Sequence, residues 1–173
     1  MYWFIADEHL GHTKILKYAN RPFKDIEEHD AEVIKRHNEV VSSQDIVIHA
    51  GDFCWCNSKK EATERYISKL SGSHIFLVGS HDHWLPHSAK YIYRKRFDGT
   101  LVFVCHYAMR TWEASHYNSF HLYGHSHGGL EHLGPYGKSF DIGVDNHNFY
   151  PWSWDEIKEE MSKRPDNFNL VCK

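Results

Sequence analysis

Short runs of apolar residues recur along the chain, and each run ends abruptly in polar residues or glycine. Uninterrupted apolar runs of about five residues that are rich in β-branched and aromatic side chains are typical of strands buried on both faces. The pattern therefore predicts five buried strands, at residues 2–6, 46–50, 75–78, 101–105 and 120–123.

Helical patterns separate the first three of these runs. Residues 25–41 carry apolar side chains at roughly helical spacing, and the Ser-x-x-Glu sequence at Ser58 is a capping box that predicts a helix running to about Leu70. A second Ser-x-x-Glu sequence at Ser153 predicts a helix that ends before Pro165.

The order of these elements predicts the fold class. Strands and helices alternate in the first half, whereas strands follow strands after about residue 98. We expect an α/β (α+β) fold with more antiparallel pairing in the second half. No repeat, low-complexity tract or linker divides the sequence, so residues 1–173 are expected to form a single domain.

Composition and charge exclude several classes of protein. Hydrophobic residues make up 41% of the 173 residues, which is enough for a packed core and argues against disorder. The net charge of −3 gives no general attraction to nucleic acid or to an anionic membrane, so a nucleic-acid partner lacks support. No apolar run is long enough for a membrane-spanning helix, and no oligomeric state follows from the pattern.

The cysteines indicate the compartment. A chain of this size does not need disulfides, and the four cysteines (Cys54, Cys56, Cys105 and Cys172) have no zinc-site or thioredoxin-like spacing. The first residues also lack the basic start and long apolar stretch of a secretion signal. We therefore expect reduced thiols in a cytoplasmic protein.

Histidine is the unusual residue, with 16 in the chain. The side chains able to bind metal gather directly after the predicted strands, where ligands bind in open α/β sheets. These strand ends carry, in chain order, Asp7 and His9, then Asp52, then Ser80, His81 and Asp82, then His106, and finally His125 and His127. Five strand ends that present carboxylate and imidazole groups at one edge predict a single site.

The chain resembles the calcineurin-like metallophosphoesterases. The resemblance rests on the order Asp-x-His, Gly-Asp, Gly-Ser-His-Asp, His and Gly-His-x-His between Asp7 and His127. The surrounding sequence, including Arg21-Pro22-Phe23 and Val144-Asp145, looks like a small single-domain bacterial or phage branch. The resemblance implies two packed mixed β-sheets flanked by helices, a four-layer sandwich, with two metal ions.

The resemblance also implies a role for each matched position. The first metal would be held by Asp7, His9 and His127, and the second by Ser80, His106 and His125. Asp52 would bridge the two ions. His81 would lie near the scissile phosphate as a catalytic residue, with Asp82 as the neighbour that orients its ring.

The chemistry of these donors fits that assignment. Mixed oxygen and nitrogen ligands suit divalent transition metals, with manganese as the first expectation and iron, zinc or nickel as alternatives. Two ions about 3.5–4 Å apart can share a hydroxide that attacks phosphorus. We expect hydrolysis of phosphomonoesters or phosphodiesters, with small phosphodiesters or nucleotides favoured because so short a chain leaves little room for a cap over the site.

Ser80 departs from the family pattern, which has asparagine at this position. A hydroxyl is a poorer neutral donor than an amide carbonyl and has a shorter reach. Natural divergence, an engineered change and a site that works mainly with one metal all remain open. We expect weaker binding of the second metal than an asparagine would give.

Other residues are candidates for contact with substrate. His12 follows His9 in the same loop, and Arg110 follows His106. Arg21 could bind substrate or pin its own loop. The basic segment 93–97 lies between aromatic residues, a pattern that can bind nucleic acid but is more often a solvated strand edge.

Parts of the sequence also fit two other functions. Residues 124–128 match the Gly-x-Ser-x-Gly elbow of serine hydrolases, with Ser126 as the nucleophile, but the glycine-rich sequence that follows argues against the helix an elbow requires. A non-catalytic histidine-rich metal-binding protein would explain the number of histidines. Such proteins usually cluster their ligands in short tracts, whereas these are spread over most of the chain.

Overall fold

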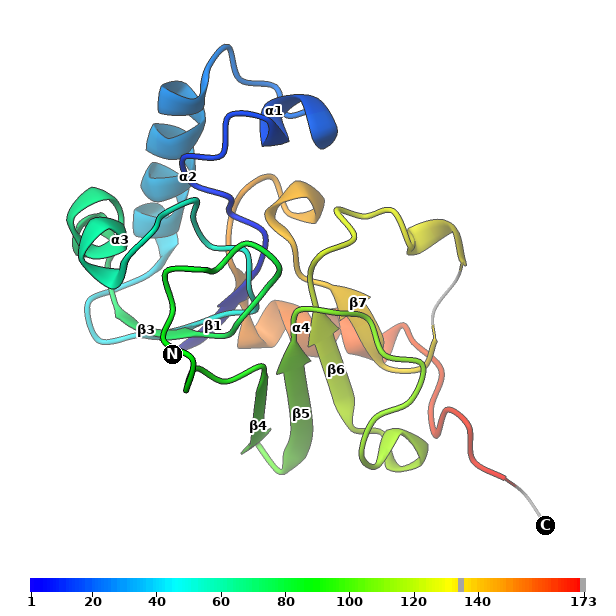
Figure 1. Cartoon of the computed structure of the whole chain (residues 1–173). Coiled ribbons are helices and arrows are strands. Elements are labelled where there is room, and N and C mark those ends of the chain that lie inside the picture. The colour runs from blue at the N-terminus through cyan, green and yellow to red at the C-terminus, as the bar shows by residue number, and fades with distance from the viewer. Residues whose placement is uncertain (134–135, 172–173) are drawn as a thin grey trace.

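Two four-stranded β-sheets pack against each other at the centre of the computed structural model, which describes residues 1–133 and 136–171 (Figure 1). The first sheet has the order β3-β2-β1-β8, and the second has the order β4-β5-β6-β7. The first sheet consists of β3 (Ser73–Phe76), β2 (Ile46–His49), β1 (Tyr2–Ile5) and β8 (Trp152–Ser153). The second consists of β4 (Ile92–Phe97), β5 (Thr100–Cys105), β6 (Phe120–Tyr123) and β7 (Ser139–Asp141).

Helices flank this pair of sheets, so the predicted fold class is confirmed. The α-helices are α1 (Ile15–Tyr18), α2 (Ile26–Val40), α3 (Lys59–Arg65) and α4 (Trp154–Ser162). Side chains of α2 and α3 pack with the first sheet on the face turned away from the second. The outer face of the second sheet is covered by irregular chain, where Trp112 packs on His121 with ring centroids 5.3 Å apart.

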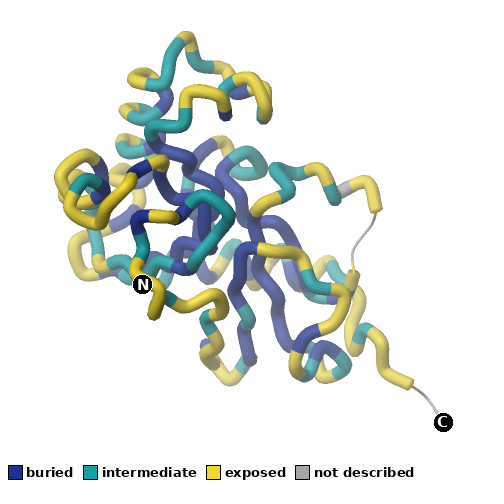
Figure 2. The backbone as a smooth tube through the Cα atoms, in the orientation of Figure 1, coloured by how far each residue is buried: buried dark blue, intermediate teal, exposed yellow. Residues whose placement is uncertain are grey.

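The central strands are largely buried on both faces, as their continuous apolar runs predict (Figure 2). The expectation of burial was wrong for β3, which lies at the edge of its sheet and has only exposed or half-buried residues. In β1, Phe4 faces the core between the sheets and Ile5 faces the helices. The core between the sheets includes Val102, Val104 and Leu122 from the second sheet. Helix α4 closes it with Trp154, Ile157 and Met161.

The helix starts follow the predicted capping signals. Ser153 forms a complete capping box with Glu156, whereas Ser58 accepts a hydrogen bond from the backbone N–H of Glu61 at 3.2 Å. Helix α3 ends earlier than predicted and continues as a 3₁₀ turn over Ile67–Lys69. Strand β3 begins two residues before the predicted start, and α1, β7 and β8 are too short to produce a pattern in the sequence.

Antiparallel pairing is confined to strands of the second half, as expected, but it is not the main pattern there. Strand β4 pairs antiparallel with β5 and β8 pairs antiparallel with β1, while β5, β6 and β7 run parallel to one another. A parallel pair needs a crossover of about a dozen residues, which is usually helical. In this protein the crossover between parallel strands is irregular chain with short 3₁₀ turns, as in segment 106–119. The absence of a helical pattern in the sequence therefore did not mean that the strands were joined as hairpins.

Two further expectations concern the compartment. Cys54, Cys56 and Cys105 are buried free thiols, and Cys172 lies outside the described residues. Across residues 1–133 and 136–171, no helix is long and apolar enough to cross a membrane.

Two buried histidines, His37 and His49, and the partly buried His74 lie together at the first sheet and α2. His49 on β2 is hydrogen-bonded to Glu8 and, through its other ring nitrogen, to His74 on β3 at 3.0 Å. His37 on α2 donates from Nε2 to the Ser71 carbonyl at 2.9 Å. Burial lowers the pKa of His49 and of His74 to about 3, and that of His37 to about 4. These rings are neutral at pH 7.

This burial predicts a loss of stability in mild acid. The unfolded chain protonates His37 near pH 6.5, but the folded chain does so only near pH 4. The stability that the neutral ring contributes is complete above pH 6.5 and is lost as the pH falls to 4, by up to about 3 kcal/mol. Urea denaturation across this range should show that His37→Gln, which keeps a donor for Ser71, has a shallower pH dependence than the wild type.

Comparing variants separates the effect of His37 on stability from that of groups whose pH dependence has the opposite sign. Burial raises the pKa of Glu8 to about 8, so its contribution to stability grows as the pH falls. His87 is exposed, and His87→Gln should keep the wild-type slope. Equal slopes for His37→Gln and the wild type would contradict the assignment.

Candidate metal centre

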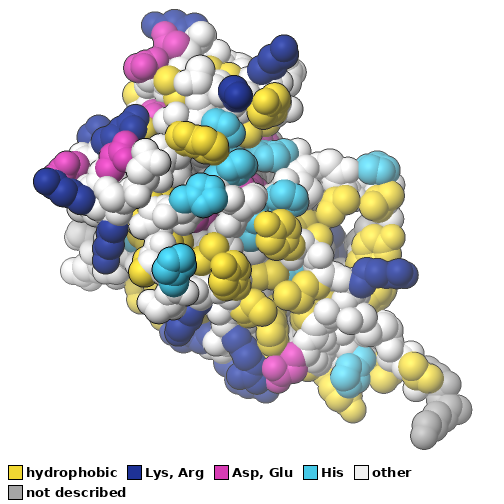
Figure 3. Space-filling model, in the orientation of Figure 1, with side chains coloured by type: hydrophobic (Ala, Val, Ile, Leu, Met, Phe, Trp, Pro, Cys, Tyr) yellow, Lys and Arg dark blue, Asp and Glu magenta, His cyan; other side chains and the backbone are white. Residues whose placement is uncertain are grey.

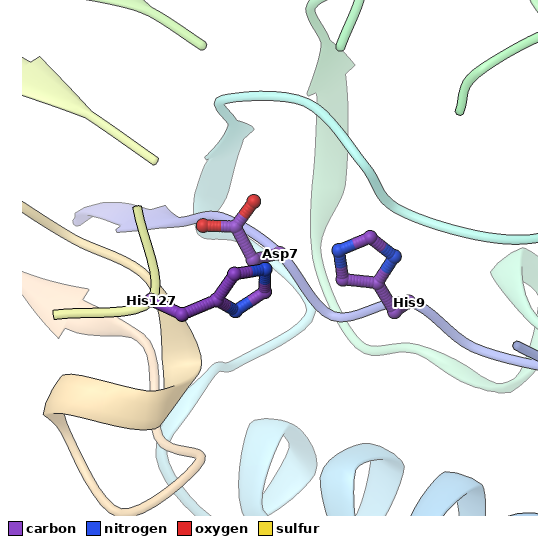
Figure 4. A group of neighbouring side chains, drawn as sticks. All are labelled: Asp7, His9 and His127. Carbon is purple, nitrogen blue, oxygen red and sulfur yellow. The ribbon is translucent and has the colours of Figure 1, made fainter. Parts of the chain in front are cut away.

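The strand ends of both sheets converge as the sequence predicts. Three groups of residues could each hold a metal ion, because within each group the potential ligand atoms all lie within 4.8 Å of one another. The groups are Asp7, His9 and His127; His9, Asp52 and His81; and Asp52, His106 and His125. Figure 4 shows the first group, with Asp7 and His9 on the segment that follows β1 and His127 on the loop that follows β6.

The backbone is strained at five of these positions. Asp7, His9, Asp52, His125 and His127 all have left-handed conformations, with φ between 46° and 69°. Such a conformation costs a non-glycine residue about 1 kcal/mol or more and persists only where surrounding contacts impose it. Other non-glycine residues elsewhere in the chain also have positive φ, but five such residues that are all potential metal ligands gather at this edge of the sheets.

Glycines at the strand ends let the backbone approach the carboxylates closely. A Cβ atom on Gly79 would lie 2.3 Å from Oδ1 of Asp52. Gly51 has φ of 99°, and a Cβ there would lie 2.7 Å from Nδ1 of His106. The Gly-Asp pair after β2 and the glycine after β3 are thus packing requirements of the site itself.

Hydrogen bonds fix which ring nitrogens face the centre. His106 donates from Nδ1 to the Ala50 carbonyl at 3.1 Å, which leaves Nε2 facing Oδ2 of Asp52 at 3.3 Å. His127 donates from Nδ1 to Oδ2 of Asp145 at 2.7 Å. A neutral histidine held in this way presents the lone pair of Nε2 for metal binding.

Asp145 contacts the candidate ligand His127, and its place beside the candidate metal ligands was not predicted from the sequence. Arg21 donates two hydrogen bonds to its carboxylate, at 2.9 and 2.8 Å, and another to the Asp7 carbonyl at 2.6 Å. Burial alone would raise the pKa of Asp145, but the hydrogen bonds from His127 and Arg21 lower it to about 2. Arg21 is buried and pins the loops together, which settles its open role in favour of structure.

Two groups at the centre lack the partners that a metal would provide. Nε2 of His9 is buried and has no hydrogen-bond partner among the residues described. Asp7 is fully buried, and burial together with the nearby Asp141 and Asp52 carboxylates raises its pKa well above the usual range. A divalent cation would supply the missing ligand contact for His9 and the missing positive charge for Asp7, so these residues fit a metal site.

Ser80 and His81 lie beside Asp52. Ser80 donates from Oγ to Oδ2 of Asp52 at 3.1 Å and lies 3.4 Å from Nε2 of His106. The backbone N–H of His81 donates to Oδ1 of Asp52 at 2.8 Å. The His81 ring is partly exposed, with Nε2 4.0 Å from the Asp52 carboxylate, so it can reach both the centre and a ligand.

The expectation that Asp82 orients the His81 ring was wrong. The Asp82 carboxylate accepts hydrogen bonds from the backbone N–H groups of Asp52, Phe53 and Gly79 and from the indole of Trp84, at 2.6 to 3.0 Å. No hydrogen bond joins it to His81 in the described parts of the chain. Asp82 instead ties the loop after β2 to the loop after β3, and so positions Asp52.

A family comparison decides what kind of site this is. The sequence profile of the calcineurin-like phosphoesterases matches residues 2–171. The chain belongs to the calcineurin-like phosphoesterase family. Membership indicates metal-dependent hydrolysis of phosphoesters.

The chain is also similar to individual proteins. The chain is 28% identical to uncharacterized protein MJ1445 of Methanocaldococcus jannaschii, over 93% of this chain and 91% of that protein. It is 33% identical to the gene 66 protein of Mycobacterium phage L5, over 46% of this chain and 39% of that one. Its fold is similar to that of AQ665 from Aquifex aeolicus, with a TM-score of 0.72, 20% identity and coverage of 92% and 98% of the two chains.

His12 and Arg110, the two residues of this phosphoesterase that were expected to contact substrate, lie in different pockets. His12 lines a pocket of about 640 Å³ together with His9, His81 and His127. Arg110 is exposed and lines a separate pocket of about 400 Å³ instead. Of the two, only His12 is brought together with the metal-ligand candidates.

The nucleophile elbow of a serine hydrolase does not form. Ser126 donates its hydroxyl to Asp141 at 2.6 Å, and the chain after it continues as a turn and not as the helix of a nucleophile elbow. In the basic segment, Arg94 pairs with Glu113 at 2.6 Å and Lys95 contacts the Tyr2 hydroxyl. The segment is the edge strand β4, which supports the solvated-edge interpretation.

Proposed function

We propose that this protein hydrolyses phosphoesters, with phosphodiesters and nucleotides favoured, at a centre that holds two divalent transition-metal ions. The observation that supports this most is the position of Asp52. One of its carboxylate oxygens lies 3.6 Å from Nε2 of His9 and 3.3 Å from Nε2 of His106, so it faces both sets of ligands.

The proposed ligands divide into two sets around this carboxylate. Asp7, His9 and His127 would hold one ion; His106, His125 and Ser80 would hold the other; Asp52 would contact both. Manganese suits this mixture of oxygen and imidazole donors, as do iron, zinc and nickel. When bound, such ions act as Lewis acids that lower the pKa of a water molecule and offset the charge of a phosphoryl group.

His81 is the proposed catalytic residue outside the metal ligands. Its backbone is fixed by the hydrogen bond to Asp52, while its ring remains partly exposed in the pocket. A protonated imidazole in this place can stabilise the oxygens of the reacting phosphoryl group or give its proton to the leaving oxygen. Asp82 acts as a positioning residue because it holds the backbone of Asp52.

The surroundings of the site support a small substrate and a reducing compartment. The pocket of about 640 Å³ is open and no separate domain covers it in the described chain. The three buried free thiols support a cytoplasmic location.

Metal dependence tests the proposed function directly. We expect chelation to abolish turnover of bis-p-nitrophenyl phosphate and manganese to restore it, because the centre requires cations to offset its carboxylates. Asp52→Asn should lower both metal content and turnover by at least about tenfold. Turnover that survives complete chelation would refute the proposal, and metal binding without turnover of any phosphoester would favour a storage role.

His81 can be separated from metal binding. We expect His81→Ala to lower kcat about 10²- to 10⁴-fold, the usual contribution of a positioned acid or base. Metal content, measured by plasma mass spectrometry, should stay within twofold of the wild type. Wild-type turnover in this variant would remove His81 from the mechanism.

The side chain of Ser80 should limit the affinity for the second metal ion. Ser80→Asn introduces the carbonyl ligand found in the family pattern, so it should raise the affinity for the second metal by about tenfold. Calorimetric titration with manganese and turnover at limiting metal measure the effect. Identical titration curves and rates in the two proteins would show that position 80 is not a ligand position.

A further inference from the structure

The pocket extends beyond the proposed metal ligands to a wall that has no assigned role. This wall is formed by the loop after β1, the start of α1 and Trp55 from the loop after β2. On the face shown in Figure 3, histidines lie side by side, with hydrophobic and basic side chains next to them. A phosphoryl group at the ligands would leave this part of the pocket free for the rest of a substrate.

Trp55 contributes an indole ring to this wall. Its indole stacks on the ring of His12 with centroids 4.5 Å apart and an interplanar angle of 17°. The residue is nevertheless 48% exposed, although it lies among the pocket residues. A large aromatic surface left open to water inside a pocket is a typical stacking platform for planar ligands.

Tyr18 at the end of α1 and Lys14, the residue before its start, add an aromatic ring and a cation at the same rim. Tyr18 is 71% exposed and lines the pocket. Lys14 also lines it and is exposed, and it forms no ion pair or hydrogen bond through its side chain with the described residues. An unpaired ammonium group beside an aromatic surface suits a ligand that combines a planar base with a negative charge.

The platform is rigidly connected to the metal-ligand loops. The backbone N–H of Trp55 donates to the Leu10 carbonyl at 2.8 Å, and that of Leu10 donates to the Phe53 carbonyl at 3.0 Å. The same two loops carry His9 and Asp52. The backbone of Trp55 is therefore held in place relative to His9 and Asp52.

We infer that Trp55, supported by His12 and flanked by Tyr18 and Lys14, forms a subsite for the nucleoside of a nucleotide phosphodiester. This inference rests on the proposed phosphodiesterase function and specifies its substrate class. The base stacks on the exposed indole, and Lys14 complements the phosphodiester charge.

Two matched substrates test the subsite. The p-nitrophenyl ester of thymidine 5′-phosphate and methyl p-nitrophenyl phosphate have the same leaving group and the same charge, and they differ in the nucleoside. The wild type should show a higher kcat/KM for the thymidine ester. Trp55→Ala should reduce the ratio of the two kcat/KM values about fivefold or more, mainly through KM, because stacking on an aromatic side chain contributes that much binding.

Control variants separate stacking from general damage. Trp55→Phe retains an aromatic face and should keep most of the ratio, whereas Tyr117→Ala, an exposed tyrosine outside the pocket, should keep all of it. Because Trp55 also supports His12, an equal fall for both substrates would indicate a structural effect. That result, or a wild-type ratio near one, would overturn the inference.

Failure of the proposed function is distinguishable from failure of the subsite. If neither ester is hydrolysed with any metal, the phosphodiesterase proposal fails, and calorimetry with thymidine 5′-monophosphate and methyl phosphate then decides on the subsite. Tighter binding of the nucleotide that is lost in Trp55→Ala would support it. Equal affinities for the two ligands would refute it.

Discussion

The parallel pairing of β1 with β2 continues beyond the ends of both strands, and the rest of the site depends on this continuation. Backbone hydrogen bonds join Asp7 to Gly51, His9 to Asp52 and Leu10 to Phe53, at 2.9 to 3.1 Å. Peptide groups in irregular segments rarely pair so regularly, and here they hold residues in left-handed conformations that would relax if the loops separated. Proposed ligands and the aromatic platform are consequently held at fixed distances.

A layer of buried charged groups surrounds this backbone frame. Asp82 binds peptide N–H groups of two loops, while Arg21 joins Asp145 to the loop after β1. Asp82 and Arg21 each form several hydrogen bonds, which reduce the cost of burying them, although burial still raises the pKa of Asp82. Asp7 is less well matched: among the described residues its carboxylate accepts from the backbone N–H of His125, and its neighbours include other acids.

Much of the fold and most of the site could be predicted because their signals are local. Apolar runs located the buried strands, and each strand end supplied the residues that meet at the centre. The relationships that could not be predicted depend on contacts between distant segments. The partners of Asp82 became visible only once β2 and β3 were placed side by side, and Arg110 proved to lie in another pocket because the chain turns away after His106. The exposed Trp55 has no periodic pattern around it, and only the folded loops show that it lines the pocket.

The hydrogen bonds of Asp82 have a consequence for how the protein matures. Its carboxylate is saturated by donors from the chain itself, so the loops that carry Asp52 are organised by folding alone. Small zinc domains behave in the opposite way, because their metal drives folding. We expect this chain to fold first and to acquire ions afterwards, so that the metal it carries in a cell reflects the supply that the finished protein meets.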